Sequence, residues 1–291
     1  MKLIGIPAHN EEGTIASVIL KSERVCDLVI VMNDGSTDET LNIMSLFNID
    51  IITRVKNHGY GASLKQLFKK SLEYDDPILV TLDSDGQHDP SEAHTLYDPI
   101  LEGKADVVIG SRFLGINSDM STSRKLAIQG LTSLTNTVSN LNITDSQSGY
   151  RAYNKKALEI VQGITQKGMG ASLEILELIG STELRVMEVP IHCTYSDDEK
   201  GSSWFHGIDV FGGLIQAIVT RGAKWILVLS VIMGIIGALF GSWAINIYIH
   251  QNYLVPNITL LAISFILMAQ LMAFMSITFF VLSRVTEKQQ Q

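Results

Sequence analysis

Short apolar runs alternate with longer segments of helical spacing through the first 110 residues or so. The runs have the length of strands, and the segments between them place apolar residues on one helical face. The expected strands are 3–6, 28–32, 49–53, 78–82 and 107–109, and the expected helices are 11–24, 38–47, 62–74 and 91–101. This alternation predicts an α/β fold, with a mostly parallel sheet that helices cover on both faces.

The pattern changes in the last quarter of the chain. Residues 225–249 and 258–282 form two almost wholly apolar runs of 25 residues each. A helix needs about 20 such residues to cross the core of a bilayer. Two buried core helices are the alternative, but neither run has a polar face. We therefore predict two transmembrane helices, with Pro256 in the turn that joins them.

Basic residues flank the two apolar runs on one side only. Arg221 and Lys224 precede the first, Arg284 and Lys288 follow the second, and the connector 250–257 has no Lys or Arg. The positive-inside rule then places both termini in the cytosol. The N-terminal MKLIGIPAHN lacks the long apolar stretch of a signal peptide, which agrees with a cytosolic N-terminal domain.

These boundaries divide the chain into a cytosolic domain, 1–203, two spans, 225–249 and 258–282, and a cytosolic tail, 283–291. Between the domain and the first span, 204–224 has the spacing of an amphipathic helix with a basic end. Such a helix can lie on anionic headgroups. It can equally pack on the soluble domain.

Charge and cysteine content narrow the functional classes. The net charge of −8 argues against nucleic acid as a partner. Cys26 and Cys193 are far apart and form no CxxC, which fits a reduced compartment and excludes a disulfide framework and a cysteine zinc site.

Polar clusters follow three of the expected strands, at 7–11, 33–38 and 83–85. Parallel sheets bind ligands just beyond the carboxyl ends of their strands. Three clusters on one edge of the sheet therefore indicate a nucleotide pocket.

The third cluster, LDSDGQHDP at 82–90, raises the question of a cation. Asp83 and Asp85 repel each other unless a positive charge lies between them, and Mg²⁺ or Mn²⁺ completed by substrate phosphates fits this arrangement. An EF-hand fails, because its sixth and twelfth positions would be His88 and His94. A solvated acidic loop remains the alternative, since a DxD pattern is common. We interpret Asp89 only as the start of the next helix.

In the second cluster, Asp34 ends the strand and could accept hydrogen bonds from a base or a ribose hydroxyl. The rest of 33–38 also fits a turn followed by a capped helix. His9 and His88 are interpreted as packing or hydrogen-bonding residues, because no His-rich metal site accompanies them.

Five segments in this order resemble a known family. They are IPAHNEEGTI (6–15), VMNDGSTDET (31–40), TLDSDGQHDP (81–90), VVIGSRF (107–113) and DSQSGYRAYNKKAL (145–158). Together they resemble the family-2 glycosyltransferases, and more narrowly the polyprenyl-phosphate (dolichyl-phosphate) mannosyl- and glucosyltransferases. The resemblance covers about residues 3–200 and implies the GT-A nucleotide-sugar-binding fold, which agrees with the alternation above.

The resemblance also implies site residues. The implied nucleotide-sugar site is Pro7, Asn10, Glu11, Asp34 and Asp83, and the implied metal site, for Mg²⁺ or Mn²⁺, is Asp83, Asp85 and Gln87. The implied acceptor site is Arg112, Arg124, Tyr150 and Arg151, and the implied catalytic group is Asp85, Arg112, Arg124 and Asp145. A guanidinium suits the phosphate of a lipid acceptor. A solvated basic face is the alternative for Arg151 and its neighbours.

The chain departs from the family in the loop 195–203. Many relatives have an arginine three residues before a glycine there, whereas this chain has Asp198 at that spacing and Lys200 nearby. The QxxRW motif of the processive polysaccharide synthases does not occur, so a chain-elongating enzyme is less favoured.

The expected activity is therefore an inverting, metal-dependent transfer of a hexose to a membrane polyprenyl or dolichyl phosphate. The donor is a nucleotide-diphosphate sugar of the GDP-mannose or UDP-glucose type. One alternative is a glycosyltransferase acting on another membrane lipid or a lipid-linked glycan, for which Asp145 would be the base. Another is a non-catalytic nucleotide-sugar-binding membrane protein. Homo-oligomerisation is left open.

Overall fold

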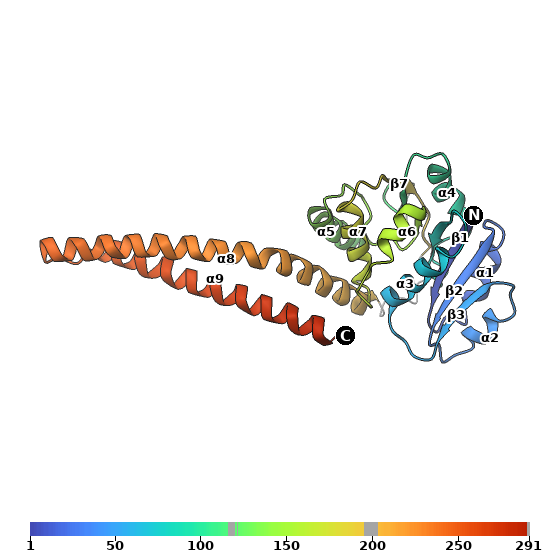
Figure 1. The fold of residues 1–291 in the computed structure, drawn as a ribbon, viewed down its shortest axis with the longest axis horizontal. Coiled ribbons are helices and arrows are strands. Elements are labelled where there is room, and N and C mark those ends of the chain that lie inside the picture. Colours follow the sequence, from blue (N-terminus) through green and yellow to red (C-terminus); the bar gives the residue numbers. More distant parts are fainter. Residues whose placement is uncertain (116–119, 121, 195–202, 290–291) are drawn as a thin grey trace. The chain divides into compact units, whose positions relative to one another are not determined.

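A computed structural model describes residues 1–115, 120, 122–194 and 203–289, with the backbone alone at 122–123, 203–225 and 279–289 (Figure 1). The chain divides into two compact units, Met1–Leu214 and Ile215–Gln291. The segment 195–202, on which the departure from the family falls, lies outside the described residues.

The first unit is built on a seven-stranded sheet with the order β3-β2-β1-β4-β6-β5-β7. The strands are β1 (Lys2–Ala8), β2 (Leu28–Asp34), β3 (Asp50–Arg54), β4 (Ile78–Thr81), β5 (Val107–Ser111), β6 (Arg151–Tyr153) and β7 (Val186–Pro190). β6 runs antiparallel to both of its neighbours, and every other neighbouring pair is parallel. This confirms the mostly parallel sheet.

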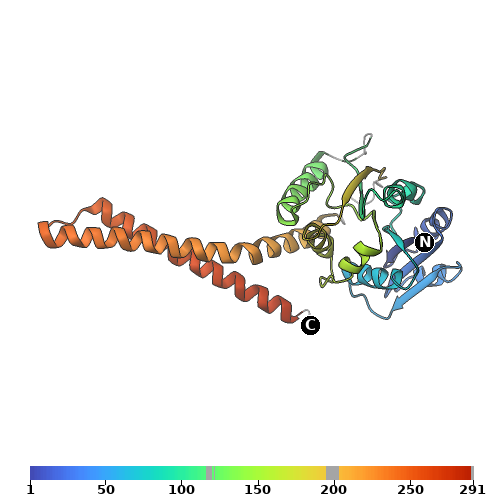
Figure 2. The ribbon, with the colours of Figure 1, turned by 45° about the horizontal axis from the view of Figure 1, so that its top comes forward.

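Helices cover both faces of this sheet (Figure 2). They are α1 (Ile15–Ser22), α2 (Thr40–Met44), α3 (Tyr60–Ser71), the 3₁₀ turn η1 (Pro90–Glu92), α4 (Ala93–Leu101), α5 (Thr122–Ser139), α6 (Lys155–Val161) and α7 (Ala171–Gly180). Because side chains alternate along a strand, Ile4 packs in one core with α1, α2 and α4, while Leu3 packs in the other with α3, α6 and α7.

The five expected strands and four expected helices are all present, with ends that differ by a few residues. Asp89 caps η1 as expected, since its Oδ1 accepts a hydrogen bond from the Ser91 amide (3.1 Å). The short strands β6 and β7 were not predicted. β6 has only three residues, and β7 has no fully buried position to mark it.

The second unit is a hairpin of α8 and α9, the two long helices of Figure 1. α8 is Ser203–Gln251 and α9 is Pro256–Gln289. Two segments, Ile226–Gln251 and Pro256–Thr278, are long and apolar enough to cross a membrane, and only 11% of each tested window is buried. A core helix of a soluble protein would be mostly buried, so this exposure favours membrane-spanning helices over core helices. The segment 204–224 is helical but continuous with the first apolar run, as part of α8.

Small residues allow the two helices of the hairpin to approach closely. A Cβ added at Gly237 would lie 3.1 Å from the backbone nitrogen of Ile266 and 3.2 Å from the Ala262 oxygen. Near this contact the Phe240 and Phe265 rings stack, with centroids 5.9 Å apart. The hairpin therefore packs in the manner of membrane helices, in which small residues bring backbones together.

Candidate active site

The strand order brings all five sequence motifs to one edge of the sheet. β2, β1 and β4 are parallel neighbours, so the loops that follow them lie side by side. β6 is antiparallel, and its first residue, Arg151, pairs with both Thr81 and Ile109. The segment that leads into β6 therefore lies where β4 and β5 end. The fifth motif thus lies beside the third and the fourth.

The loops after β1 and β2 are hydrogen-bonded to each other. The Asn10 side-chain oxygen accepts from the Thr37 amide (2.8 Å), and the Glu11 amide donates to Thr40 Oγ1 (2.8 Å). Asn10 has φ +57°, a conformation that asparagine tolerates better than most residues. Pro7 is buried in β1 and pairs with Met32. The hydrogen bonds thus join the two loops that carry Asn10 and Glu11, and the contact of these residues with a nucleotide stays a prediction.

Asp34 is buried beneath the turn that leads to α3. Its carboxylate accepts from the amides of His58 (3.1 Å) and Gly59 (2.7 Å) and from Arg54 Nη1 (3.3 Å). Only 3% of Asp34 is exposed. The geometry gives Asp34 the role of fixing this turn, and its contact with a nucleoside stays a prediction.

Asp83 and Asp85 lie in the loop after β4, where both are half-buried. Asp83 Oδ1 accepts a hydrogen bond from the hydroxyl of Tyr60 (3.1 Å). Asp85 Oδ1 accepts from the Gln87 amide (2.9 Å), which bends the loop after the strand. Residues two apart in a strand point to the same face of the sheet, so the spacing of Asp83 and Asp85 places both side chains on one side even before this bend.

The main chain of Gly149 lies directly against Asp83. A Cβ added at Gly149 would lie 2.5 Å from Asp83 Oδ2, so only glycine leaves room for the carboxylate as it stands. Thr81 holds this contact in place by donating a hydrogen bond to the Gly149 carbonyl (2.8 Å). The glycine of the fifth motif thus shapes the acidic site of the third.

Arg112 and Asp145 form a buried bidentate ion pair. Arg112 Nε donates to Asp145 Oδ2 (2.7 Å) and Nη2 to Oδ1 (2.8 Å), and the Arg112 amide also donates to Oδ2 (3.2 Å). The side chains are 7% and 0% exposed. Glu188 of β7 supports the pair, because its carboxylate accepts from the amides of Thr144 (2.8 Å) and Asp145 (3.1 Å).

Tyr150 and Arg151 are buried, which differs from the solvated basic face considered for Arg151. Tyr150 is 0% exposed and donates to the Asp89 carbonyl (3.2 Å). Arg151 is 2% exposed and donates to the Ser146 carbonyl (2.8 Å), and its Nε has no hydrogen-bond partner. Their expected contact with an acceptor stays a prediction, and in this geometry both side chains support the site from within.

His88 is buried between the acidic loop and the ion pair. Burial lowers its pKa, and the charges that act on it are Asp83, Arg112 and Asp145, of which the two carboxylates raise the pKa. Its ring lies against that of Tyr150, with centroids 5.3 Å apart. His88 therefore packs against Tyr150, and packing is one of the two roles interpreted from the sequence.

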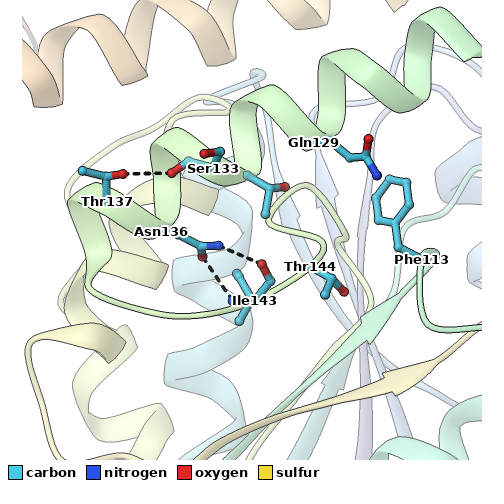
Figure 3. A pocket seen from close by; sticks show the side chains of 8 residues that line it. Phe113, Gln129, Ser133, Asn136, Thr137, Ile143 and Thr144 are labelled. Carbon is cyan, nitrogen blue, oxygen red and sulfur yellow. Dashed lines mark hydrogen bonds between the residues drawn. The ribbon is translucent and has the colours of Figure 1, made fainter.

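A hollow of about 750 Å³ lies beside Phe113 and Thr144, the chain neighbours of Arg112 and Asp145 (Figure 3). Amide and hydroxyl side chains of α5 line it together with the neighbours of Arg112 and Asp145; the residues are Phe113, Gln129, Thr132, Ser133, Asn136, Thr137, Ile143 and Thr144. Arg124 is half-buried in the first turn of the same helix. The hollow thus places hydroxyl and amide side chains of α5 beside Thr144.

Tyr60 and Glu188 are the site residues that sequence reasoning missed. Tyr60 begins α3, and 23 residues separate it from the aspartate it contacts. Glu188 lies in a strand that was not predicted. A pattern along the chain carries no signal for such contacts, since they depend on which elements the sheet places side by side.

The fold is that of the GT-A glycosyltransferases. Glucosyl-3-phosphoglycerate synthase from Mycobacterium tuberculosis, solved in complex with Mn²⁺, uridine diphosphate and phosphoglyceric acid, superposes with a TM-score of 0.60. The likeness covers 75% of this chain and 78% of that one, at 19% sequence identity.

The chain belongs to glycosyl transferase family 2, whose model matches residues 3–161. It is 30% identical over 235 residues to a UDP-N-acetylglucosamine–dolichyl-phosphate N-acetylglucosaminyltransferase of Methanococcus voltae, covering 72% of this chain and 93% of the relative. It is 29% identical to an undecaprenyl-phosphate mannosyltransferase of Micrococcus luteus, covering 76% and 91%. The protein is therefore a glycosyltransferase.

Proposed function

We propose that the protein transfers a sugar from a nucleotide-diphosphate donor to a membrane polyprenyl or dolichyl phosphate, with inversion at the anomeric carbon. One observation carries the proposal. Relatives named for transfer to dolichyl or undecaprenyl phosphate match this chain over 93% and 91% of their own length. The two apolar helices add a membrane anchor next in sequence to that catalytic domain.

The residues after β4 suit a hard divalent ion. Among the described residues, no three His, Cys, Asp or Glu side chains gather into a protein-only metal site. Mg²⁺ and Mn²⁺ do not require such a site, because they bind one or two carboxylates together with substrate phosphates and water. Asp83, Asp85 and Gln87 would hold the ion, which when bound neutralises the charge that develops on the leaving diphosphate.

The acceptor phosphate needs little activation. The second pKa of a phosphate monoester is near 6, so its oxygen is already largely ionised at neutral pH. The protein must then hold two anionic substrates together, and this is the task we assign to Arg112 and Arg124. Asp145 holds the Arg112 guanidinium by two hydrogen bonds. The arginine side chain is therefore already ordered before a phosphate binds.

The geometry favours a phosphate acceptor over a hydroxyl acceptor. A hydroxyl acceptor would need a base, and Asp145 was the candidate. Asp145 is 0% exposed, and both of its oxygens accept hydrogen bonds from Arg112. Both oxygens are thus already bound by Arg112 and are out of reach of an acceptor hydroxyl, so we assign Asp145 a positioning role.

The membrane topology and domain limits belong to the same proposal. We infer that 1–203 is cytosolic, that 204–224 is a juxtamembrane helix, and that 225–249 and 258–282 cross the bilayer before a cytosolic tail, 283–291. The continuity of α8 from Ser203 supports a direct link from the catalytic domain into the first span. The basic residues at the two outer ends support the orientation.

A membrane assay tests the proposed activity. Membranes containing the protein are incubated with radiolabelled GDP-mannose, UDP-glucose or UDP-N-acetylglucosamine, with and without added polyprenyl phosphate, and with Mn²⁺ or EDTA. We expect an acid-labile, alkali-stable lipid product with one donor, dependent on the phosphate and lost in EDTA. A product that does not depend on polyprenyl phosphate would indicate another lipid acceptor. No transfer from any donor would contradict the catalytic proposal.

A further inference from the structure

Tyr60 connects the start of α3 to the acidic loop after β4. Gly59, with φ +95°, turns the chain into α3 so that the tyrosine enters the site side of the sheet. Its hydroxyl then donates to Asp83 Oδ1 at 3.1 Å. A tyrosine hydroxyl can donate one hydrogen bond, and here that bond goes to one oxygen of the carboxylate.

The other side of Asp83 is fixed by the main chain. Oδ2 lies against Gly149, where even a methyl group would come within 2.5 Å. The carboxylate is thus held by a hydrogen bond at Oδ1 and by a steric limit at Oδ2. These two contacts limit the rotation of the Asp83 side chain.

We propose that Tyr60 is a positioning residue, which holds the Asp83 carboxylate in the orientation that receives the divalent ion and the donor diphosphate. The inference rests on the proposed function, because it takes Asp83 as a ligand of that ion. Tyr60 does not contact the reacting atoms. It acts by keeping Asp83 oriented before the ion arrives, so that binding does not have to order the side chain.

A purely structural role is the competing explanation, since Tyr60 also packs against the core formed with α3, α6 and α7. Tyr60→Phe separates the two roles, because it keeps the ring and removes only the hydroxyl. Tyr97→Phe is the matched control. Tyr97 is 1% exposed, belongs to the other core, and donates one hydrogen bond to the Leu3 carbonyl (2.8 Å).

The experiment measures ion binding directly. The full chain is purified in detergent, and Mn²⁺ is titrated by calorimetry in the presence of UDP or GDP, whichever the wild type binds. We expect Tyr60→Phe to raise the dissociation constant of Mn²⁺ about tenfold, the scale of one lost hydrogen bond to a charged group. Tyr97→Phe should leave the constant unchanged, although both variants lose a buried hydroxyl.

A double-mutant cycle shows whether the effect passes through Asp83. In an Asp83→Ala background, we expect Tyr60→Phe to have no further effect on the dissociation constant. Wild-type Mn²⁺ binding by Tyr60→Phe, or an equal loss in both tyrosine variants, would overturn the positioning role alone. A wild-type protein that binds no Mn²⁺ with either nucleotide would overturn the metal dependence of the proposed function, and the inference with it.

Discussion

Arg112 and Asp145 form an ion pair that is closed to solvent, with two parallel hydrogen bonds of 2.7 and 2.8 Å between guanidinium and carboxylate. Both residues were expected at the site from the sequence, but in separate roles. Their pairing means that neither can be altered without changing the surroundings of the other.

We predict that Asp145→Ala lowers the free energy of unfolding by about 3–5 kcal/mol, because it leaves the Arg112 guanidinium buried without its partner. Transfer should be lost as well. The measurement is thermal or denaturant unfolding of the detergent-purified protein. Glu73→Gln is the control, since it breaks the exposed Lys70–Glu73 pair and should cost less than about 1 kcal/mol. Equal effects of the two substitutions would contradict the importance of the buried pair.

Asp85→Ala should reduce sugar transfer about a hundredfold or more, since it removes a carboxylate from the ion that neutralises the leaving diphosphate. The variant should remain in the membrane fraction, because Asp85 is remote in sequence from the apolar helices. Transfer is measured over a range of Mn²⁺ concentrations, and wild-type turnover in this variant would refute the assignment of Asp85 to the metal.

Gly149→Ala should impair transfer far more than stability. The added methyl group would lie 2.5 Å from Asp83 Oδ2, so the carboxylate would have to leave the position in which Tyr60 holds it. The displaced carboxylate would no longer meet the ion, and a misplacement of about 1 Å can reduce a rate a hundredfold. Gly130→Ala is the matched control, because nothing lies within 4 Å of its added Cβ. Unchanged transfer by Gly149→Ala would show that Asp83 does not need its present position.

Acid should destabilise the catalytic domain in part through Asp106. Hydrogen bonds from Arg185 lower the pKa of this carboxyl below its ordinary value of 3.8. Because the folded-state pKa is depressed, the stabilisation is present above pH of about 4 and is lost as the pH falls toward the folded-state pKa. Unfolding measured across this range should depend less steeply on pH in Asp106→Asn than in the wild type. Asp75→Asn, at an exposed position, should keep the wild-type slope.

Gly237→Leu should disrupt the packing of α8 against α9, since a side chain there meets the backbone of Ile266 at 3.1 Å. We expect a lower melting temperature in detergent. Gly234→Ala provides the control, because its Cβ would make an ordinary contact of 3.8 Å with Ala269. A melting temperature unaffected by Gly237→Leu would show that the helices do not rely on this approach.

The sequence predicts the first half of the sheet well, because β1, β2 and β4 are buried, largely apolar runs of strand length. In the second half it predicts β5 but neither β6 nor β7. Arg151 begins a strand of three residues and is 2% exposed, although an arginine followed four and five residues later by lysines suggests a solvated segment. Its burial follows from pairing with β4 and β5 on either side, which no local pattern encodes.

The site shows the same division. The location of Asp83 and Asp85 could be predicted from their place after a strand, since that position fixes the edge of the sheet on which they lie. The contacts of Tyr60 and Glu188 could not, because each comes from an element distant in sequence from its partner. The motifs thus predict where the polar residues gather, whereas the contacts that hold them appear only in three dimensions.

The antiparallel strand β6 divides the sheet into two halves of different origin. Every strand on one side of it comes from residues 2–81, and both strands on the other side come from residues 107–190. If the first half recognises the donor and the second half the acceptor, the two specificities can diverge separately. Chimeras that exchange the chain near residue 104 between relatives would then recombine donors with lipids, provided that Thr81 and Gly149 still meet across the join.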